Sequence, residues 1–166
     1  MASIIRISGI VDESIVDGHG IRFVIFTQGC PHHCEGCHNP ATHDFTGGNN
    51  IDINTLFATI NENPLLKGVT FSGGEPFCQP EPLAELAKKV HRINRDVITY
   101  TGYTLEELQA MNNSAIQRLL DETDYLIDGK FIINQRDLTL RFRGSTNQRI
   151  IDMNKTRHQG HLVTIE

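Results

Sequence analysis

Four short runs rich in β-branched and aromatic residues recur along this chain, with helix-like segments between them. The runs cover residues 21–27, 68–71, 96–100 and 124–127. Segments 53–61 and 82–93 carry apolar residues at helical spacing, with one apolar face each. Strands that alternate with helices in this way predict βαβ units, and we expect an α/β fold with a mainly parallel sheet.

Capping signals mark two further helices in the second half of the chain. Thr104-x-x-Glu107 and Ser114-x-x-Gln117 both have the spacing of a capping box. In such a box, each side chain satisfies a backbone N–H of the first helical turn. We therefore expect one helix to begin at each box, between the third and the fourth strand.

The remaining strands are predicted from weaker patterns. An edge strand is expected over residues 3–10, and short strands over 149–153 and 161–165. Leu138, Leu140 and Phe142 alternate with polar residues, which is typical of a half-buried strand.

Size and charge limit the class of protein. The chain has 166 residues, which predicts a single domain over 1–166. Its net charge of −5 argues against binding to nucleic acid, and no apolar run approaches the ~20 residues of a membrane span. The first residues do not resemble a signal peptide. We expect a cytoplasmic protein, with no membrane association and with reduced thiols.

Three of the four cysteines lie within eight residues, in a loop that covers about 28–50. Cys30, Cys34 and Cys37 have the spacing C-x3-C-x2-C, while Cys78 lies apart. Clustered thiols in a reducing compartment favour a metal site. Three thiolates would leave one iron of a 4Fe–4S cluster open, whereas a structural zinc site would need His33 or His38 as its fourth ligand.

Further motifs follow the predicted strands. Ser72-Gly73-Gly74-Glu75-Pro76 follows the second strand, Thr101-Gly102-Tyr103 the third, and Asp128 and Lys130 lie at the end of the fourth. The carboxyl ends of parallel strands share one edge, so these motifs are expected to meet the cysteines there. Two glycines let a backbone approach a ligand closely. Glu75 is expected to accept hydrogen bonds from an ammonium group, or else only to cap the next helix.

The cysteine triplet and the GGEP segment together resemble the radical S-adenosylmethionine (SAM) superfamily. The matching residues are Cys30, Cys34, Cys37, Gly73, Gly74, Glu75 and Pro76. The resemblance implies a truncated (β/α) barrel and one 4Fe–4S cluster held by the three cysteines. It also implies that the amine and carboxylate of SAM chelate the open iron, and that the GGEP segment contacts its methionine moiety.

Other segments narrow the resemblance to the activases of glycyl radical enzymes. Residues 17–22, 29–30 and 37–40 are similar to those activases, and Asp128-x-Lys130 resembles their SAM site. Segments 100–108 and 142–152, together with Gly36, most resemble the activating proteins of anaerobic ribonucleoside-triphosphate reductase. The extra cysteines of some formate-lyase-type activases are missing, so one cluster is expected.

The resemblance implies a reaction and a partner. The reduced cluster would cleave SAM to a 5′-deoxyadenosyl radical, which generates a glycyl radical on the reductase. The resemblance also implies a low-potential electron donor such as flavodoxin. It implies no catalytic residue beyond the cluster and SAM ligands. The alternatives are an activase of the pyruvate formate-lyase type, a small-molecule radical SAM enzyme and a zinc-binding module.

Several residues lie outside these motifs. Cys78 is expected to be a small buried hydrophobe, and His19 a loop residue. Asp17 and Arg22 are candidates to tie their loop to the cysteine loop. Arg141, Arg143 and Arg149 form either a solvated strand face, a docking surface for a partner or a contact with the SAM carboxylate.

Overall fold

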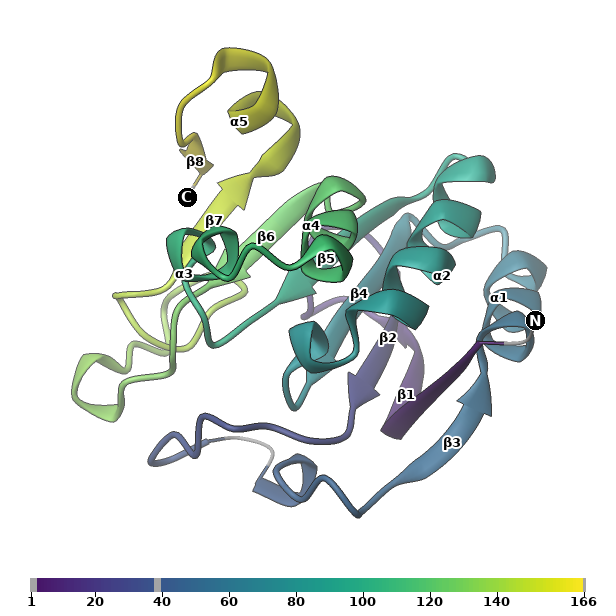
Figure 1. Ribbon diagram of the computed structural model, residues 1–166, viewed down its shortest axis with the longest axis horizontal. Helices are drawn as coiled ribbons and strands as arrows, with labels where there is room; N and C mark the ends of the chain where they lie inside the picture. The colour runs from purple at the N-terminus through teal and green to yellow at the C-terminus, as the bar shows by residue number, and fades with distance from the viewer. Residues whose placement is uncertain (1–2, 38–39, 166) are drawn as a thin grey trace.

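A computed structural model describes residues 3–37 and 40–165, in which all the strands belong to one sheet (Figure 1). The strands are β1 (Ile4–Ser14), β2 (Arg22–Thr27), β3 (Asn49–Asp52), β4 (Gly68–Gly73), β5 (Asp96–Tyr100), β6 (Tyr125–Asp128), β7 (Arg149–Asp152) and β8 (Thr164–Ile165). The helices are α1 (Ile53–Glu62), α2 (Pro80–Arg92), α3 (Leu105–Ala110), α4 (Ser114–Asp121) and α5 (Met153–Gln159). Short 3₁₀ turns occur at Pro40–Thr42, Pro76–Cys78 and Ile133–Gln135. No helix of the described part is long and apolar enough to cross a bilayer.

The sheet is mixed, with order β3-β1-β2-β4-β5-β6-β7-β8. Strands β2, β4, β5 and β6 are parallel, as predicted for an α/β fold. The pairs on both sides of them, which involve β1, β3, β7 and β8, are antiparallel. The sheet is therefore partly rather than mainly parallel, because hairpin-like connections extend it at both ends.

The main hydrophobic core lies between the sheet and α1, α2 and α4, which cover the same face (Figure 1). Phe23 of β2 and Phe71 of β4 belong to this core, as do Leu83 and Leu86 of α2. Burying each such side chain contributes roughly 1.5–3 kcal/mol. The opposite face carries a smaller apolar cluster and long loops, so it is the face that remains free for a site.

The first strand differs from its prediction. β1 runs on to Ser14, and β3 pairs along its outer side, so β1 is not an edge strand. β3 lies at the end of the predicted 28–50 loop and has the polar sequence NNID, which carries no strand signal. It leads directly into α1, whose N-cap is Asp52.

The strand predicted around 138–142 is wrong. Asp137 accepts hydrogen bonds from the backbone and side chain of Thr139, which forms a turn instead. Leu138 is 80% exposed, and Phe142 has a positive φ of 63°. Phe142 packs on the apolar cluster of Ile98, Ile127 and Ile150, so the alternating pattern belongs to a loop across the open face.

One predicted capping box is confirmed and the other is wrong. Thr104 and Glu107 form the reciprocal pair that begins α3. The N-cap of α4 is Asn113 rather than Ser114, because the Asn113 side chain accepts from the backbone N–H groups of Ala115 and Ile116. Helix α5 follows β7 without a sequence prediction, and the predicted strand at 161–165 shortens to β8.

Candidate functional site

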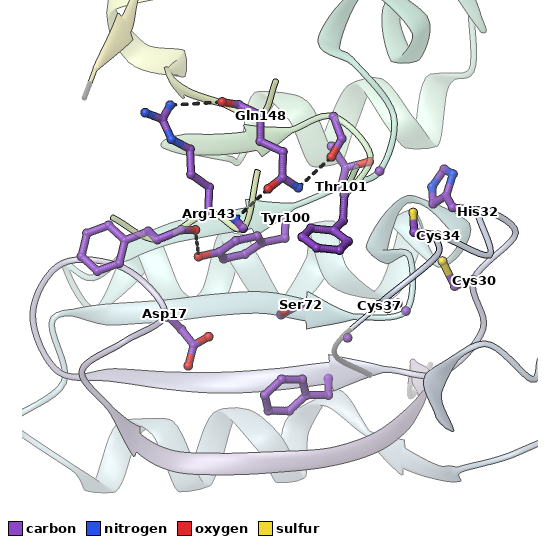
Figure 2. Close-up of a pocket in the computed structure, with 18 of the residues that line it drawn as sticks. Asp17, Cys30, His32, Cys34, Cys37, Ser72, Tyr100, Thr101, Arg143 and Gln148 are labelled. Carbon is purple, nitrogen blue, oxygen red and sulfur yellow. Dashed lines mark hydrogen bonds between the residues drawn. The ribbon is translucent and has the colours of Figure 1, made fainter. Parts of the chain in front are cut away.

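The predicted motifs meet in one open cavity of about 510 Å³ at the carboxyl ends of the parallel strands. Its walls at this end include Cys30, His32, Cys34, Cys37, Ser72, Gly73, Gly74, Thr101, Gly102 and Gly129. These residues lie at the end of β4 or just after β2, β4, β5 and β6, which is why segments far apart in sequence become neighbours (Figure 2). The site therefore lies where parallel α/β sheets bind their ligands.

All three clustered cysteines are free thiols that line this cavity. Cys30 is buried, and Cys34 and Cys37 are partly buried. The Cys30 backbone N–H donates to the His43 carbonyl at 3.2 Å, and the Cys37 N–H to the Cys34 carbonyl at 3.2 Å. Burial raises the pKa of the Cys30 and Cys34 thiols, so binding of a metal centre to them releases protons.

The donor set fits an iron–sulfur cluster. Three soft thiols face a common space large enough for a cofactor. Among the residues that the structure describes, no three Cys, His, Asp or Glu side chains are gathered tightly enough for a single metal ion. A 4Fe–4S cluster binds each thiolate through a different iron, so its ligands stand farther apart than those of one ion.

Gly73 and Gly74 bring backbone into the cavity wall. Gly73 has a φ of 102°, and a Cβ there would overlap the backbone of Thr27. A Cβ on Gly74 would overlap the carbonyl of Gly29, the residue before the first cysteine. The Gly74 N–H also donates to the Thr27 carbonyl at 2.9 Å. Only glycine permits this close approach of β4 to the end of β2.

Glu75 is turned away from the cavity. Its carboxylate is fully buried and accepts from His32 Nε2 at 2.6 Å, from Thr101 Oγ1 at 2.9 Å and from the Gly102 N–H at 2.8 Å. Its second oxygen accepts from the Phe77 N–H at 3.0 Å. Pro76 is buried beside it. Both residues thus support the wall from behind, whereas Gly73 and Gly74 form its surface.

Asp128 and Lys130 flank the cavity without lining it. Asp128 is buried, and its carboxylate accepts from the Leu105 N–H at 2.8 Å and from Arg149 Nε at 3.0 Å. The Lys130 side chain is exposed, while its carbonyl accepts from Asn147 Nδ2 at 2.8 Å. The residue between them, Gly129, is the one that reaches the cavity.

The far part of the cavity contains residues that the sequence analysis did not single out as a site. Its walls include Phe26, Tyr100, Leu140, Phe142 and Gln148. The Tyr100 hydroxyl donates to the Phe142 carbonyl at 2.6 Å, and burial raises the Tyr100 pKa (Figure 2). The available signal was the alternation of side chains along each strand, which places Phe26, Ser72 and Tyr100 on the face of the sheet opposite to the main core.

The loop before β2 is tied to the sheet and not to the cysteine loop. Arg22 is fully buried and binds Asp96 at 2.6 Å and Thr70 Oγ1 at 2.8 Å. His19 Nε2 lies 2.7 Å from Asp96, so it has a structural partner in β5. Asp17 lines the far part of the cavity and accepts from Ser14.

Other sequence predictions have mixed outcomes. Cys78 is exposed, so its prediction as a small buried hydrophobe is wrong. His33 is exposed and its ring meets that of His43, whereas His38, the other histidine considered for zinc, lies outside the described residues.

Arg141, Arg143 and Arg149 do not form one common surface. Arg149 binds Asp128 and Glu106, and Arg141 is exposed over the Phe142 ring. Arg143 lines the cavity and donates to the Gln148 carbonyl at 3.1 Å. Its Nε is buried, and no hydrogen-bond partner for it occurs among the residues described.

Known proteins resemble this chain over most of its length. The 4Fe-4S single cluster domain family matches residues 16–151. The anaerobic ribonucleoside-triphosphate reductase-activating protein of Vibrio cholerae is 35% identical in an alignment of 143 residues that covers 81% of this chain and 89% of that protein. The protein of that name in Escherichia coli K12 is 34% identical, with 81% and 90% covered, and that of Enterobacteria phage T4 is 32% identical, with 81% and 86% covered.

A solved structure, QueE from Escherichia coli, aligns with a TM-score of 0.48 at 19% identity, over 61% of this chain and 53% of QueE. The sequence relatives are closer and cover more of the chain. Because the family model matches residues 16–151 and these relatives match most of the chain, the chain belongs to the family of anaerobic ribonucleoside-triphosphate reductase-activating proteins.

Proposed function

We propose that this protein is a radical SAM activase that cleaves SAM reductively and generates a glycyl radical on anaerobic ribonucleoside-triphosphate reductase. The observation that carries the proposal is one cavity that joins the three clustered thiols to the backbone of Gly73 and Gly74. Relatives named as activating proteins of that reductase support the choice of partner.

The residues divide into those that bind and those that support. Cys30, Cys34 and Cys37 would hold one 4Fe–4S cluster and leave its fourth iron for SAM. Gly73 and Gly74 would present backbone groups to the methionine moiety. The other members of the proposed SAM site, Glu75, Pro76, Asp128 and Lys130, shape or flank this wall.

The cofactors supply the radical chemistry, while the chain binds, orients and excludes water. When bound by Cys30, Cys34 and Cys37, the cluster would supply the single electron for cleavage of SAM to methionine and a 5′-deoxyadenosyl radical, and that radical would take a hydrogen atom from a glycine Cα of the reductase. No side chain of the cavity is needed as an acid or base. The apolar walls Phe26, Leu140 and Phe142 would keep water from the reacting carbon.

The open side of the cavity suits a polypeptide substrate. The loops across this face leave apolar side chains exposed, including Val16 and Leu138. Arg141 and Arg143 are candidates for the polar rim of a docked reductase, whereas Arg149 is engaged within the chain. We place the protein in the cytoplasm as a single domain over 1–166. It would take electrons from a low-potential donor such as flavodoxin, without contact to nucleic acid or membrane.

The test is an anaerobic activation assay with reductant and SAM, in which the reductase and pyruvate formate-lyase are supplied separately. The expected result is a glycyl signal in electron paramagnetic resonance on the reductase, and none when Cys34→Ala replaces the wild type. A signal on the formate-lyase alone would refute the choice of partner. A stable zinc site without iron would refute the radical chemistry.

A further inference from the structure

His32, in the cysteine loop, turns its side chain into the protein. It lies between Cys30 and Cys34, and its side chain is only 5% exposed, whereas the neighbouring His33 is exposed. His32 Nε2 lies 2.6 Å from Glu75 Oε1. A bond therefore joins the loop between the first two cysteines to the segment that follows β4.

The groups around this bond form a socket built from the ends of β4 and β5. Thr101 Oγ1 lies 2.9 and 3.0 Å from the two oxygens of Glu75, and the Gly102 N–H donates to the same carboxylate at 2.8 Å. The Tyr103 ring meets the His32 ring edge-on, with centroids 4.5 Å apart. The Thr101-Gly102-Tyr103 motif thus encloses the imidazole and orients its acceptor.

Gly102 shows that the socket is shaped around the histidine ring. Its φ is not among the positive values of the chain, so the backbone conformation there does not demand glycine. A Cβ at position 102, however, would overlap the His32 ring, whose atoms are its three nearest neighbours. The missing side chain at 102 is therefore explained by the space that His32 fills.

We propose that His32 is a positioning residue that locks the cysteine loop into the socket of Glu75, Thr101, Gly102 and Tyr103. This inference rests on the proposed function, because it concerns how the chain holds the cluster and SAM. The lock fixes Cys30 and Cys34 relative to Gly73 and Gly74, which lie just before Glu75 in the wall. It also explains why Glu75 faces protein donors rather than the cavity.

The physical reason is that a loop of glycines, prolines and polar residues does not hold its ligands still. Residues that orient the direct ligands of a metal centre typically change metal affinity by about 10- to 100-fold when removed. Here the socket supplies a hydrogen bond and a ring contact to the loop. We expect the same order of effect on cluster retention and on SAM binding.

The test compares four reconstituted variants with the wild type. His32→Ala removes the ring, and Gly102→Ala fills its place while it keeps every polar group of the socket. His32→Gln retains an N–H donor, and His33→Ala is the matched control in the same loop. The measurements are iron loss to a chelator, SAM affinity by equilibrium dialysis, and the thermal unfolding of the cluster-free proteins.

The expected result is iron loss about 10- to 100-fold faster for both His32→Ala and Gly102→Ala. SAM affinity should fall in the same two variants, and His33→Ala should match the wild type in both measurements. His32→Gln should lie closer to the wild type than His32→Ala does. Thermal unfolding identifies any variant that has lost its fold. Such a variant is set aside, and His32→Gln and the remaining folded variants then test the proposed role of His32.

The proposed role of His32 would be refuted if folded His32→Ala and Gly102→Ala proteins kept iron and bound SAM like the wild type. Equal effects of His33→Ala and His32→Ala would overturn it as well. The proposed function fails differently, since wild-type protein would then assemble no cluster or would form no glycyl radical on the reductase.

Discussion

The guanidinium of Arg149 binds both carboxylate oxygens of Asp128 across the antiparallel pair β6 and β7. The two residues are direct partners in the strand register, with Arg149 Nε 3.0 Å from Asp128 Oδ1. The same carboxylate accepts from the Leu105 N–H, at the first residue of α3. One buried charge therefore ties the last parallel strand to the strand and the helix beside it.

We predict that Arg149→Ala destabilises the cluster-free protein by about 3 kcal/mol, because it leaves a buried carboxylate without its charged partner. This value lies at the lower end of the usual range, since the Arg149 side chain is 29% exposed. The measurement is urea unfolding. Arg141→Ala, which removes an exposed arginine over Phe142, should cost about 1 kcal/mol or less. Similar losses for the two variants would contradict the prediction.

Replacement of Cys30, Cys34 or Cys37 by alanine should each abolish a stable cluster, because each removes one of three thiols in the shared cavity. Cys78→Ala should retain the iron content of the wild type, since this exposed thiol lies outside the cavity wall. Iron and sulfide analysis after anaerobic reconstitution measures both. A Cys78→Ala protein without iron, beside a Cys34→Ala protein that keeps it, would show that the ligands are misassigned.

Glu75→Ala should lower both stability and SAM affinity. It leaves the donors of His32, Thr101 and Gly102 without their buried acceptor, and each unsatisfied group costs about 1–3 kcal/mol. Urea unfolding of the cluster-free protein and SAM titration of the loaded protein are the two measurements. Glu35→Ala, an exposed glutamate of the cysteine loop, is the control. Weaker SAM binding with unchanged stability would indicate that the carboxylate faces the cofactor instead.

His91 lies away from the cavity and makes the free energy of unfolding depend on pH. Its two ring nitrogens each lie 2.8 Å from a carboxylate, Nδ1 from Glu122 and Nε2 from Asp124. The bond to Asp124 is the largest cause that raises the His91 pKa above its ordinary 6.5, although burial opposes it. Burial acts to raise the Asp124 pKa, but hydrogen bonds from His91, Asn154 and Val97 outweigh it and lower the pKa below 3.8.

The stabilisation from His91 is therefore complete below pH 6.5 and is lost as the pH rises through its raised pKa. That from Asp124 is present above pH 3.8 and is lost as the pH falls through the lowered pKa. His91→Gln should flatten the alkaline side of the profile, as urea unfolding at a series of pH values would show. His161→Gln, an exposed control, should keep the wild-type profile. An unchanged profile in His91→Gln would refute the assignment.

The sequence alone predicted much of the fold and the place of the site. The apolar runs that became β2, β4, β5 and β6 are continuous enough to identify buried parallel strands. Parallel strands end at one edge, so motifs that follow them had to converge there. Strand β3, by contrast, is polar, and the alternation around Leu138 occurs in a loop, because its turn at Asp137 competes with any strand pairing.

Which side chains of the motifs face the cavity was decided only by the tertiary structure. Glu75 and Asp128 are both acidic residues in the right segments, yet their carboxylates point to protein donors. His32 is 43 residues from Glu75, and Arg149 is 21 residues from Asp128. A motif brings a carboxylate to the correct edge of the sheet. The direction in which the carboxylate turns depends on the donors that distant segments place beside it, because a buried charge is stable only where it is hydrogen-bonded.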